Sequence, residues 1–225
     1  MNFLVISLSR KRTLSPINYN QWILSTVLLF ASLSLYSQKM ERPLRLGVHI
    51  GYSQQDVFPF GDEDYAHTSR YIKLQIGTPI WERQRQSLEV LVEPSVYFVE
   101  HQLLNLFFIK PSHPNFQENR ELFTQNRSYQ EYALNLGLIY AYSLNQNFKT
   151  YGLISVGPMT ATADTERQRK GFSFSDILGI GMRYELGKWN YDLRFSLRHV
   201  SSANLRRPNN GHNNAGIEIG FSYNL

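Results

Sequence analysis

The feature that most constrains how this chain can fold is an alternation of apolar and polar residues with a period of two. Between Leu44 and Tyr52 every second residue is apolar or aromatic, and arginine, glycine and histidine occupy the positions between them. Successive side chains of a β-strand point to opposite faces of a sheet, so this pattern predicts a strand with one apolar face. Eight such segments are present, the fifth with ambiguous parity, at about residues 44–52, 72–76, 88–98, 132–140, 148–160, 175–186, 189–197 and 217–225. The chain is therefore expected to be all-β.

The other face of the predicted strands carries charged residues and glycines, such as Arg45 and Gly47. Side chains can fill the whole interior of an eight-stranded barrel, so these polar residues fit inside one and leave no open pore. Acidic and basic residues share this face and are expected to form a structural interior of ion pairs: Glu89, Glu93, Glu131, Arg45, Lys73, Arg194 and Arg198. The apolar face then points outward, as in a barrel that spans a membrane.

The connections between the predicted strands alternate between long and short. The long ones fall at about residues 53–70, 101–128, 161–171 and 202–214, and the short ones at about 81–86, 143–147 and 187–188. Bacterial outer-membrane barrels have short periplasmic turns and longer external loops. We therefore predict an all-β fold, an eight-stranded antiparallel outer-membrane β-barrel, with every long loop outside. A secreted soluble barrel with its apolar face inward is the alternative, although such a barrel does not require this alternation.

The N-terminal region has the composition of a targeting segment. A basic cluster, Arg10-Lys11-Arg12, precedes an apolar run from Trp22 to Tyr36, and small and polar residues follow. This order is typical of a secretory signal peptide, so residues 1–37 are expected to be removed and residues 38–225 to form one transmembrane barrel domain. A retained membrane anchor is the alternative, but the run is short for a spanning helix. Removing the three bases lowers the net charge from +5 to +2, so charge gives no indication of a nucleic-acid partner.

Three polar residues near the C-terminus have the parity of the outward face. His199 and Ser201 continue the odd-numbered apolar positions of segment 189–197, and Asn213 has the parity of Ile217 in the next strand. They are therefore expected on the outside of the barrel, at its external end. Polar side chains are costly to expose to hydrocarbon, so a group of them on this face indicates a function.

These three residue types can together form a hydrolytic site. A serine hydroxyl needs a neighbouring base to become a nucleophile, and the base needs a third group to hold its tautomer. His199 can be the base for Ser201, because side chains two residues apart on a strand are roughly 6–7 Å apart at Cβ. Asn213 can orient His199. A substrate that reaches this face is a membrane lipid, and an ester is the bond most suited to such a site. The His-x-Ser pattern alone has low specificity, since His67-Thr-Ser69 repeats it within a predicted loop.

The segment 197–225 resembles the signature of the lipid A 3-O-deacylases, the PagL-like acyloxyacyl hydrolase family. Two stretches carry the resemblance, followed by a final strand: His199-Val-Ser201-Ser-Ala-Asn204 and Pro208-Asn-Asn-Gly-His-Asn213. The resemblance implies an eight-stranded outer-membrane barrel whose membrane-facing Ser-His-acid triad hydrolyses the acyl ester at the 3-position of lipid A. The eight-strand layout extends the likeness over the rest of the predicted barrel.

By position, the resemblance implies His199 as the general base, Ser201 as the nucleophile and Asn209 as a side chain that helps to form the oxyanion hole. The implied reaction releases a 3-hydroxy fatty acid and needs no cofactor. The implied partners are lipid A within lipopolysaccharide and the outer membrane itself.

Three positions depart from the family pattern. Ser202 replaces an asparagine. Asn204 replaces a glycine whose backbone is an oxyanion donor, and asparagine tolerates positive φ better than most residues, so the turn can be kept. Asn213 stands where the best-known member has an acid; an amide can orient a histidine but stabilises an imidazolium less than a carboxylate does. These departures leave an inactive member of the family as an alternative.

A basic run lies in the predicted loop 161–171. Arg167, Arg169 and Lys170 can meet lipid A phosphates or anionic core sugars, or can simply be solvated. The chain has no cysteine, which excludes disulfides and thiolate metal sites, and the sequence contains no visible metal constellation or nucleotide motif. The main alternative to an esterase is a non-enzymatic barrel, structural or adhesive, that uses its long loops. The preferred acyl chain, a homodimer and the role of loop 101–128 are left open.

Overall fold

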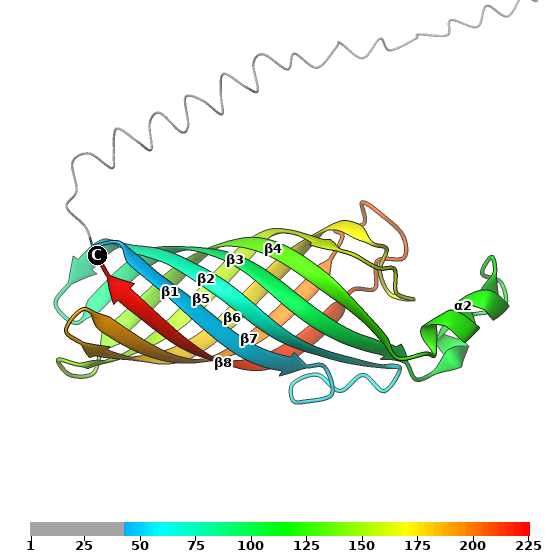
Figure 1. Cartoon of the computed structure of the whole chain (residues 1–225), viewed down its shortest axis with the longest axis horizontal. Coiled ribbons are helices and arrows are strands. Elements are labelled where there is room, and N and C mark those ends of the chain that lie inside the picture. The colour runs from blue at the N-terminus through cyan, green and yellow to red at the C-terminus, as the bar shows by residue number, and fades with distance from the viewer. Residues whose placement is uncertain (1–42) are drawn as a thin grey trace, which may run out of the picture. The chain divides into compact units, whose positions relative to one another are not determined.

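Eight antiparallel strands close into a barrel in which each strand pairs with its neighbours in sequence and β1 pairs with β8 (Figure 1). The computed structural model describes residues 43–225, so the predicted signal peptide, residues 1–37, and the predicted start of the domain at residue 38 lie outside the described residues. The strands are β1 (Arg45–Gln54), β2 (Tyr65–Arg83), β3 (Gln86–Leu103), β4 (Arg127–Ser143), β5 (Phe148–Ala161), β6 (Gly171–Leu186), β7 (Trp189–Ser201) and β8 (His212–Asn224). The predicted eight-stranded all-β barrel is confirmed.

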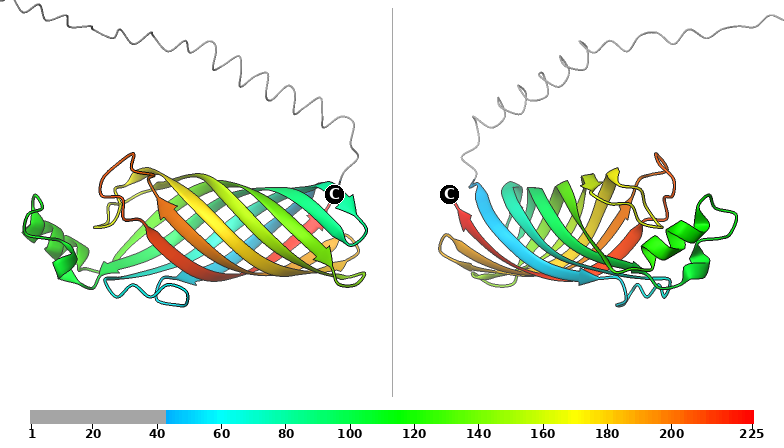
Figure 2. Two further views of the ribbon diagram at one scale, coloured as in Figure 1. Left: turned by 180° about the vertical axis from the view of Figure 1, so that it is seen from behind. Right: turned by 45° about the vertical axis from the view of Figure 1, so that its right-hand side comes forward.

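The connections alternate in length as predicted. Short turns join the strands at the end of the barrel where the C-terminus lies, and long loops join them at the other end (Figures 1 and 2). The longest loop, between β3 and β4, contains a short 3-10 helix, η1 (Leu106–Phe108), and the helix α2 (Phe116–Phe123), which projects from the long-loop end. Neither helix in residues 43–225 is long and apolar enough to cross a membrane.

Strand β2 begins earlier than the sequence predicts. His67 and Ser69, which we expected in a loop, lie in β2 with their side chains buried inside the barrel. The outward residues of this stretch are Ala66, Thr68 and Arg70, which include no large apolar side chain. The period-two signal is therefore missing here, although the backbone is a regular strand.

The two faces of each strand differ in polarity. On β1, Leu46, Val48 and Ile50 point outward and are 40%, 45% and 51% exposed, whereas Arg45 and His49 between them are 6% and 0% exposed. Large apolar side chains are exposed in this way on all eight strands. Such an outward apolar band is the surface of a barrel that contacts lipid.

Ion pairs fill the barrel interior, as predicted. Arg194 Nη2 donates to Glu93 Oε1 at 2.6 Å, and Arg194 Nε lies 2.8 Å from Glu218 Oε1. Lys73 Nζ donates to the same carboxylate at 3.2 Å. Further pairs line the rest of the interior: Arg45–Glu89, Arg183–Glu89, Arg183–Asp192 and Arg198–Glu131. Charges removed from water need partners of this kind, so the interior is a structural network.

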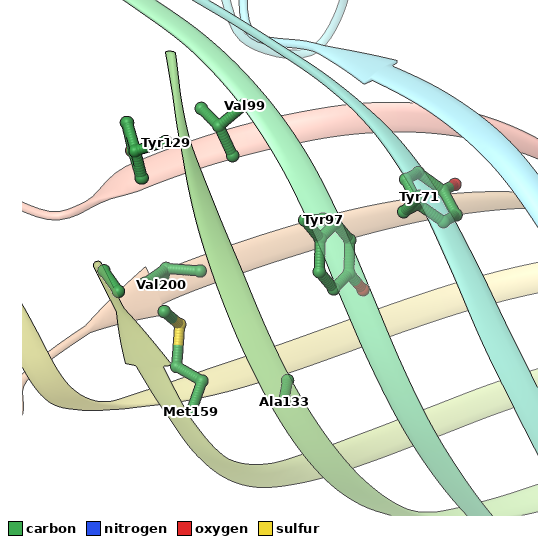
Figure 3. Close-up of a cluster of buried hydrophobic side chains, with 8 residues drawn as sticks. Tyr71, Tyr97, Val99, Tyr129, Ala133, Met159 and Val200 are labelled. Carbon is green, nitrogen blue, oxygen red and sulfur yellow. The ribbon is translucent and has the colours of Figure 1, made fainter. Parts of the chain in front are cut away.

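Apolar and aromatic side chains pack inside the long-loop half of the barrel (Figure 3). Val200 is fully buried in this cluster with Tyr97, Tyr129 and Met159. Because Val200 points inward, its neighbours in β7 must point outward. The cluster therefore fixes the end of the strand that carries His199 and Ser201.

Candidate active site

His199 lies near the end of β7 on the outward face, beside the long loops. Asn213, on β8, is its direct partner in the strand register, and His199 Nδ1 lies 2.7 Å from Asn213 Oδ1. An amide oxygen can only accept a hydrogen bond, so Nδ1 carries the proton in this pair. The Nε2 lone pair of His199 is then available to accept a proton. The predicted outward position of both residues is confirmed.

Ser201 is the last residue of β7 and is half-buried on the same face as His199. Within residues 43–225 no hydrogen bond joins the Ser201 hydroxyl to His199. The two side chains are neighbours at the i and i+2 positions of one strand, and catalytic hydrogen bonds are often long before substrate binds. The structure therefore brings together three of the residues that the sequence singles out: His199, Ser201 and Asn213.

Asp176 is an outward residue that sequence reasoning missed. It is exposed on β6 and is the direct register partner of His199 on the side away from Asn213. Residues paired across two strands have Cβ atoms about 4.5–5.5 Å apart. His199 is thus flanked by a carboxylate on one neighbouring strand and an amide on the other. The signal was present in the sequence, since Asp176 has the parity of the apolar positions that follow it.

The turn after β7 is organised by Asn209. Its Oδ1 accepts hydrogen bonds from the Ser202 backbone N–H and hydroxyl, both at 2.6 Å, and its Nδ2 donates to Asn204 Oδ1 at 3.2 Å. Asn204 has a φ of 62° and Ala203 a φ of 49°, so the turn is left-handed where the sequence predicted that Asn204 would permit it. An amide nitrogen carries two hydrogens, so Asn209 keeps one donor for a further acceptor.

Gly211 allows the chain to return closely along β7. Its φ is 61°, and a Cβ at this position would lie 2.1 Å from the backbone oxygen of Val200. Any other residue would push the start of β8 away from the end of β7. Glycine here therefore supports the register that sets Asn213 opposite His199.

The basic run of the β5–β6 loop divides into two roles. Arg167 Nε donates to the Gly211 backbone oxygen at 2.7 Å, its Nη1 lies 3.2 Å from Asp62 Oδ2, and its guanidinium stacks on the Tyr65 ring at 4.2 Å. Arg167 thus braces three loops against one another. Arg169 and Lys170 are exposed and line a groove of about 1460 Å³ above the barrel.

A second groove runs across the outward face from the site. It has a volume of about 580 Å³, and its lining is almost entirely apolar. His199 and Asp176 lie in its wall. Outward side chains of β4 to β7 supply most of the apolar lining: Leu136, Leu138, Ile154, Val156, Leu178 and Leu197. A groove of this volume and polarity on a lipid-facing surface is suited to a hydrocarbon chain.

Several solved structures share the barrel. The crystal structure of the outer membrane enzyme PagL superposes with a TM-score of 0.51 at 11% identity, over 80% of this chain and 99% of that chain. Neisserial surface protein A gives 0.47 at 12% identity, over 81% and 97% of the two chains. The attachment invasion locus protein Ail of Yersinia pestis gives 0.42 at 10% identity, over 83% and 100%. At 11% identity the likeness to the PagL structure shows the fold alone.

Sequence comparison identifies the family. No curated protein sequence matches the chain. The model of the lipid A 3-O-deacylase (PagL) family matches residues 107–222, which is more than half of the chain and contains all the residues of the candidate site. The chain therefore belongs to the lipid A 3-O-deacylase (PagL) family.

Proposed function

We propose that this chain is an outer-membrane esterase that removes the acyl chain ester-linked at the 3-position of lipid A. One observation carries the proposal: the hydrogen-bonded pair of His199 and Asn213 lies beside Ser201 on the apolar outer face of the barrel. Membership of a lipid A deacylase family supplies the substrate class. We also propose that residues 1–37 are the signal peptide, removed near Ser37, and that residues 38–225 form the barrel domain.

The first step is acylation of the serine. His199 Nε2 takes the proton of Ser201 Oγ as this oxygen attacks the ester carbonyl of lipid A. The negative charge that develops on the carbonyl oxygen is stabilised by the free N–H of Asn209 and a backbone N–H of the turn at Asn204. One donor of this kind contributes a few kcal/mol to transition-state stabilisation. His199 then gives its proton to the sugar oxygen, and the C–O bond to the acyl chain breaks.

The second step is hydrolysis of the acyl-serine. His199 Nε2 accepts a proton from a water molecule that attacks the acyl carbon, and it returns this proton to Ser201 Oγ as the bond breaks. The products are a 3-hydroxy fatty acid and lipid A with a free 3-hydroxyl. The site lies at the long-loop end, so water can reach it from outside while the acyl chain stays in lipid.

The two flanking residues have complementary roles. Asn213 holds His199 in the tautomer that leaves Nε2 free, through the bond at 2.7 Å. It offers no charge to the imidazolium that forms during each step. The carboxylate of Asp176, on the other neighbouring strand, supplies a negative charge on the same outward face and compensates in part for the amide.

The two grooves suit the two halves of a lipid A molecule. The apolar groove of about 580 Å³ has His199 in its wall and can hold the acyl chain that is cleaved. Four basic residues line the groove of about 1460 Å³ and can bind phosphate groups: Arg169, Lys170, Arg206 and Arg207. Arg167, which braces the loops, supports this surface rather than contacting phosphate.

The experiment is a mass spectrum of lipid A from a Gram-negative host that expresses the protein. We expect the wild type to remove one ester-linked hydroxyacyl chain and Ser201→Ala to remove none. Ser69→Ala is the matched control, because Ser69 belongs to the same His-x-Ser pattern but points into the barrel. Identical lipid A from wild type and Ser201→Ala, both correctly folded, would favour a non-enzymatic barrel instead.

A further inference from the structure

We propose that the barrel binds a divalent transition-metal ion, with Zn²⁺ as the best-suited ion, at His67, Glu131 and His212. These residues come from β2, β4 and β8 and meet inside the barrel near its long-loop end. Each is at most 5% exposed. Their ligating atoms all lie within 4.8 Å of one another. The proposal is independent of the esterase function.

Two ring nitrogens in this cluster lack partners. His67 Nε2 and His212 Nε2 are buried and have no hydrogen-bond partner among the described residues. His212 Nε2 lies 3.5 Å from Glu131 Oε1, and the two histidine rings stack with centroids 4.0 Å apart. Buried polar atoms are rarely left unpaired, because each costs the free energy of its lost hydration. A bound ion would satisfy both nitrogens at once.

The surrounding hydrogen bonds orient His67 as a metal ligand. His67 Nδ1 lies 3.3 Å from His101 Nδ1, and His101 Nε2 lies 2.9 Å from Glu166 Oε2. If His67 donates from Nδ1 and His101 donates from Nε2, both contacts are satisfied and the lone pair of His67 Nε2 points into the cluster. Histidine ligands of zinc usually donate their second N–H to a carboxylate, a backbone carbonyl or water, and here His101 relays this contact to the Glu166 carboxylate.

The charges of the cluster also favour a cation. Two buried carboxyl groups take part: Glu131 belongs to the cluster, and Glu166 contacts His101, which in turn contacts His67. Arg198 Nη1 donates to Glu131 Oε2 at 2.6 Å, which leaves Oε1 directed at His212. The same contact fixes the carboxylate in place. Oε1 accepts only a long hydrogen bond from the Tyr129 hydroxyl, at 3.5 Å, and an ion would replace this contact.

The donor set indicates which ion fits. Two imidazoles and one carboxylate, with a fourth position for water, are a common zinc ligand set. Zn–N bonds of about 2.0–2.1 Å at tetrahedral angles place ligand atoms roughly 3.3 Å apart. The two stacked rings must therefore tilt relative to one another when the ion binds, so that both Nε2 lone pairs converge on it. His212 is the first residue of β8 and is directly followed by Asn213. An ion at this point would therefore fix the strand that orients His199 from the inside of the barrel wall.

The test uses the full chain, folded in detergent, stripped with a chelator and then incubated with ZnCl₂. We expect about one zinc per chain after desalting. His67→Gln and His212→Gln should each lose this zinc, and His101→Gln should weaken its binding by roughly 10- to 100-fold. His113→Gln is the matched control, since His113 is exposed in the β3–β4 loop, and it should retain the zinc.

Two results would overturn the proposal: wild type that retains no zinc, or His67→Gln and His212→Gln that retain as much as wild type, which would show adventitious binding only. A second measurement needs no variant. Zinc should raise the midpoint of thermal unfolding of the wild type, whereas magnesium at the same concentration should not, because only an ion that binds the folded state stabilises it. Equal midpoints with the two ions would also contradict the site.

Discussion

The inner and outer surfaces of the barrel use polar residues in opposite ways, and the strand that carries His199 shows both. Arg194 and Arg198 point inward and are paired with carboxylates on other strands. His199, one residue further along, points outward among large apolar side chains, with one amide as its hydrogen-bond partner. The inner polar residues hold the barrel closed. The outer ones contribute little to stability, so their presence on an apolar surface indicates chemistry.

The largest expected effect is on the outer surface. His199→Ala should lower kcat/KM for lipid A deacylation by more than about 10³-fold, because loss of the base also disables the nucleophile. The free energy of unfolding should change by no more than about 0.5 kcal/mol, as at other exposed positions. Deacylation rates and urea unfolding of the same preparation measure both quantities. A variant that loses stability instead would place His199 among the structural residues.

The inner surface should respond in the opposite way. Glu218→Ala removes the partner of Lys73 and a partner of Arg194, and should lower the free energy of unfolding by about 3–5 kcal/mol. Ile219→Ala is the control, because Ile219 is the next residue and points outward. It should lower the free energy of unfolding by less in a lipid environment. Urea unfolding in vesicles compares them. Equal losses would mean that the interior pairs add nothing beyond side-chain volume.

The amide at position 213 gives a gain-of-function prediction. Asn213→Asp keeps an acceptor for His199 Nδ1 and adds a negative charge beside the imidazolium. A charge-assisted hydrogen bond contributes about 1 kcal/mol more than a neutral one, so kcat should rise roughly five- to tenfold. Asn213→Leu, which removes the acceptor, should lower it. If Asn213→Asp is no faster than wild type, Asn213 does not orient the base.

Asp176 provides the matching test on the other side of His199. Asp176→Asn removes the charge but keeps the shape, and kcat should fall severalfold, with no change in folding. The double variant Asp176→Asn with Asn213→Asp should recover the loss, because one carboxylate beside His199 is then restored. Steady-state rates of the wild type, the two single variants and the double variant test this expectation. If the effects of the two substitutions are independent, Asp176 and Asn213 do not share the role of stabilising the His199 imidazolium.

The smallest effect is expected at the loop surface. Exchange of both Arg169 and Lys170 for alanine should raise KM about two- to threefold and leave kcat unchanged, since these residues contact only the phosphate end of the substrate. Added salt should raise the KM of the wild type more than that of the variant, because salt screens the attraction between exposed charges and phosphate. If the variant and the wild type have the same KM at low salt, Arg169 and Lys170 do not bind the substrate.

The alternation of residue types predicts most of the fold, because the apolar and polar faces of each strand lie on opposite sides of the barrel wall. It predicted all eight strands and the outward parity of His199, Ser201 and Asn213. It was ambiguous for β5, where Tyr151 and Leu153 are apolar and yet point inward. The same rule did not single out Asp176, which has the parity of the outward positions of β6 but is not apolar.

Contacts between distant segments were beyond the sequence. More than sixty residues separate His67 from Glu131 and Glu131 from His212. No local spacing pattern therefore predicts that the three side chains come together inside the barrel. The bracing role of Arg167 depends on Asp62 and Gly211, which belong to two other loops. Such contacts follow from strand register and loop packing, which a single sequence does not encode as a local pattern.

The proposed function requires Ser201 to be an activated nucleophile on the lipid-facing surface. The most direct measurement is labelling of the folded protein with a long-chain alkyl fluorophosphonate, followed by peptide mass spectrometry. An activated serine displaces fluoride and keeps the phosphonyl group. We expect one adduct, on Ser201, in the wild type and none in His199→Ala. A folded wild type that stays unlabelled, or that is labelled at another residue, would contradict it.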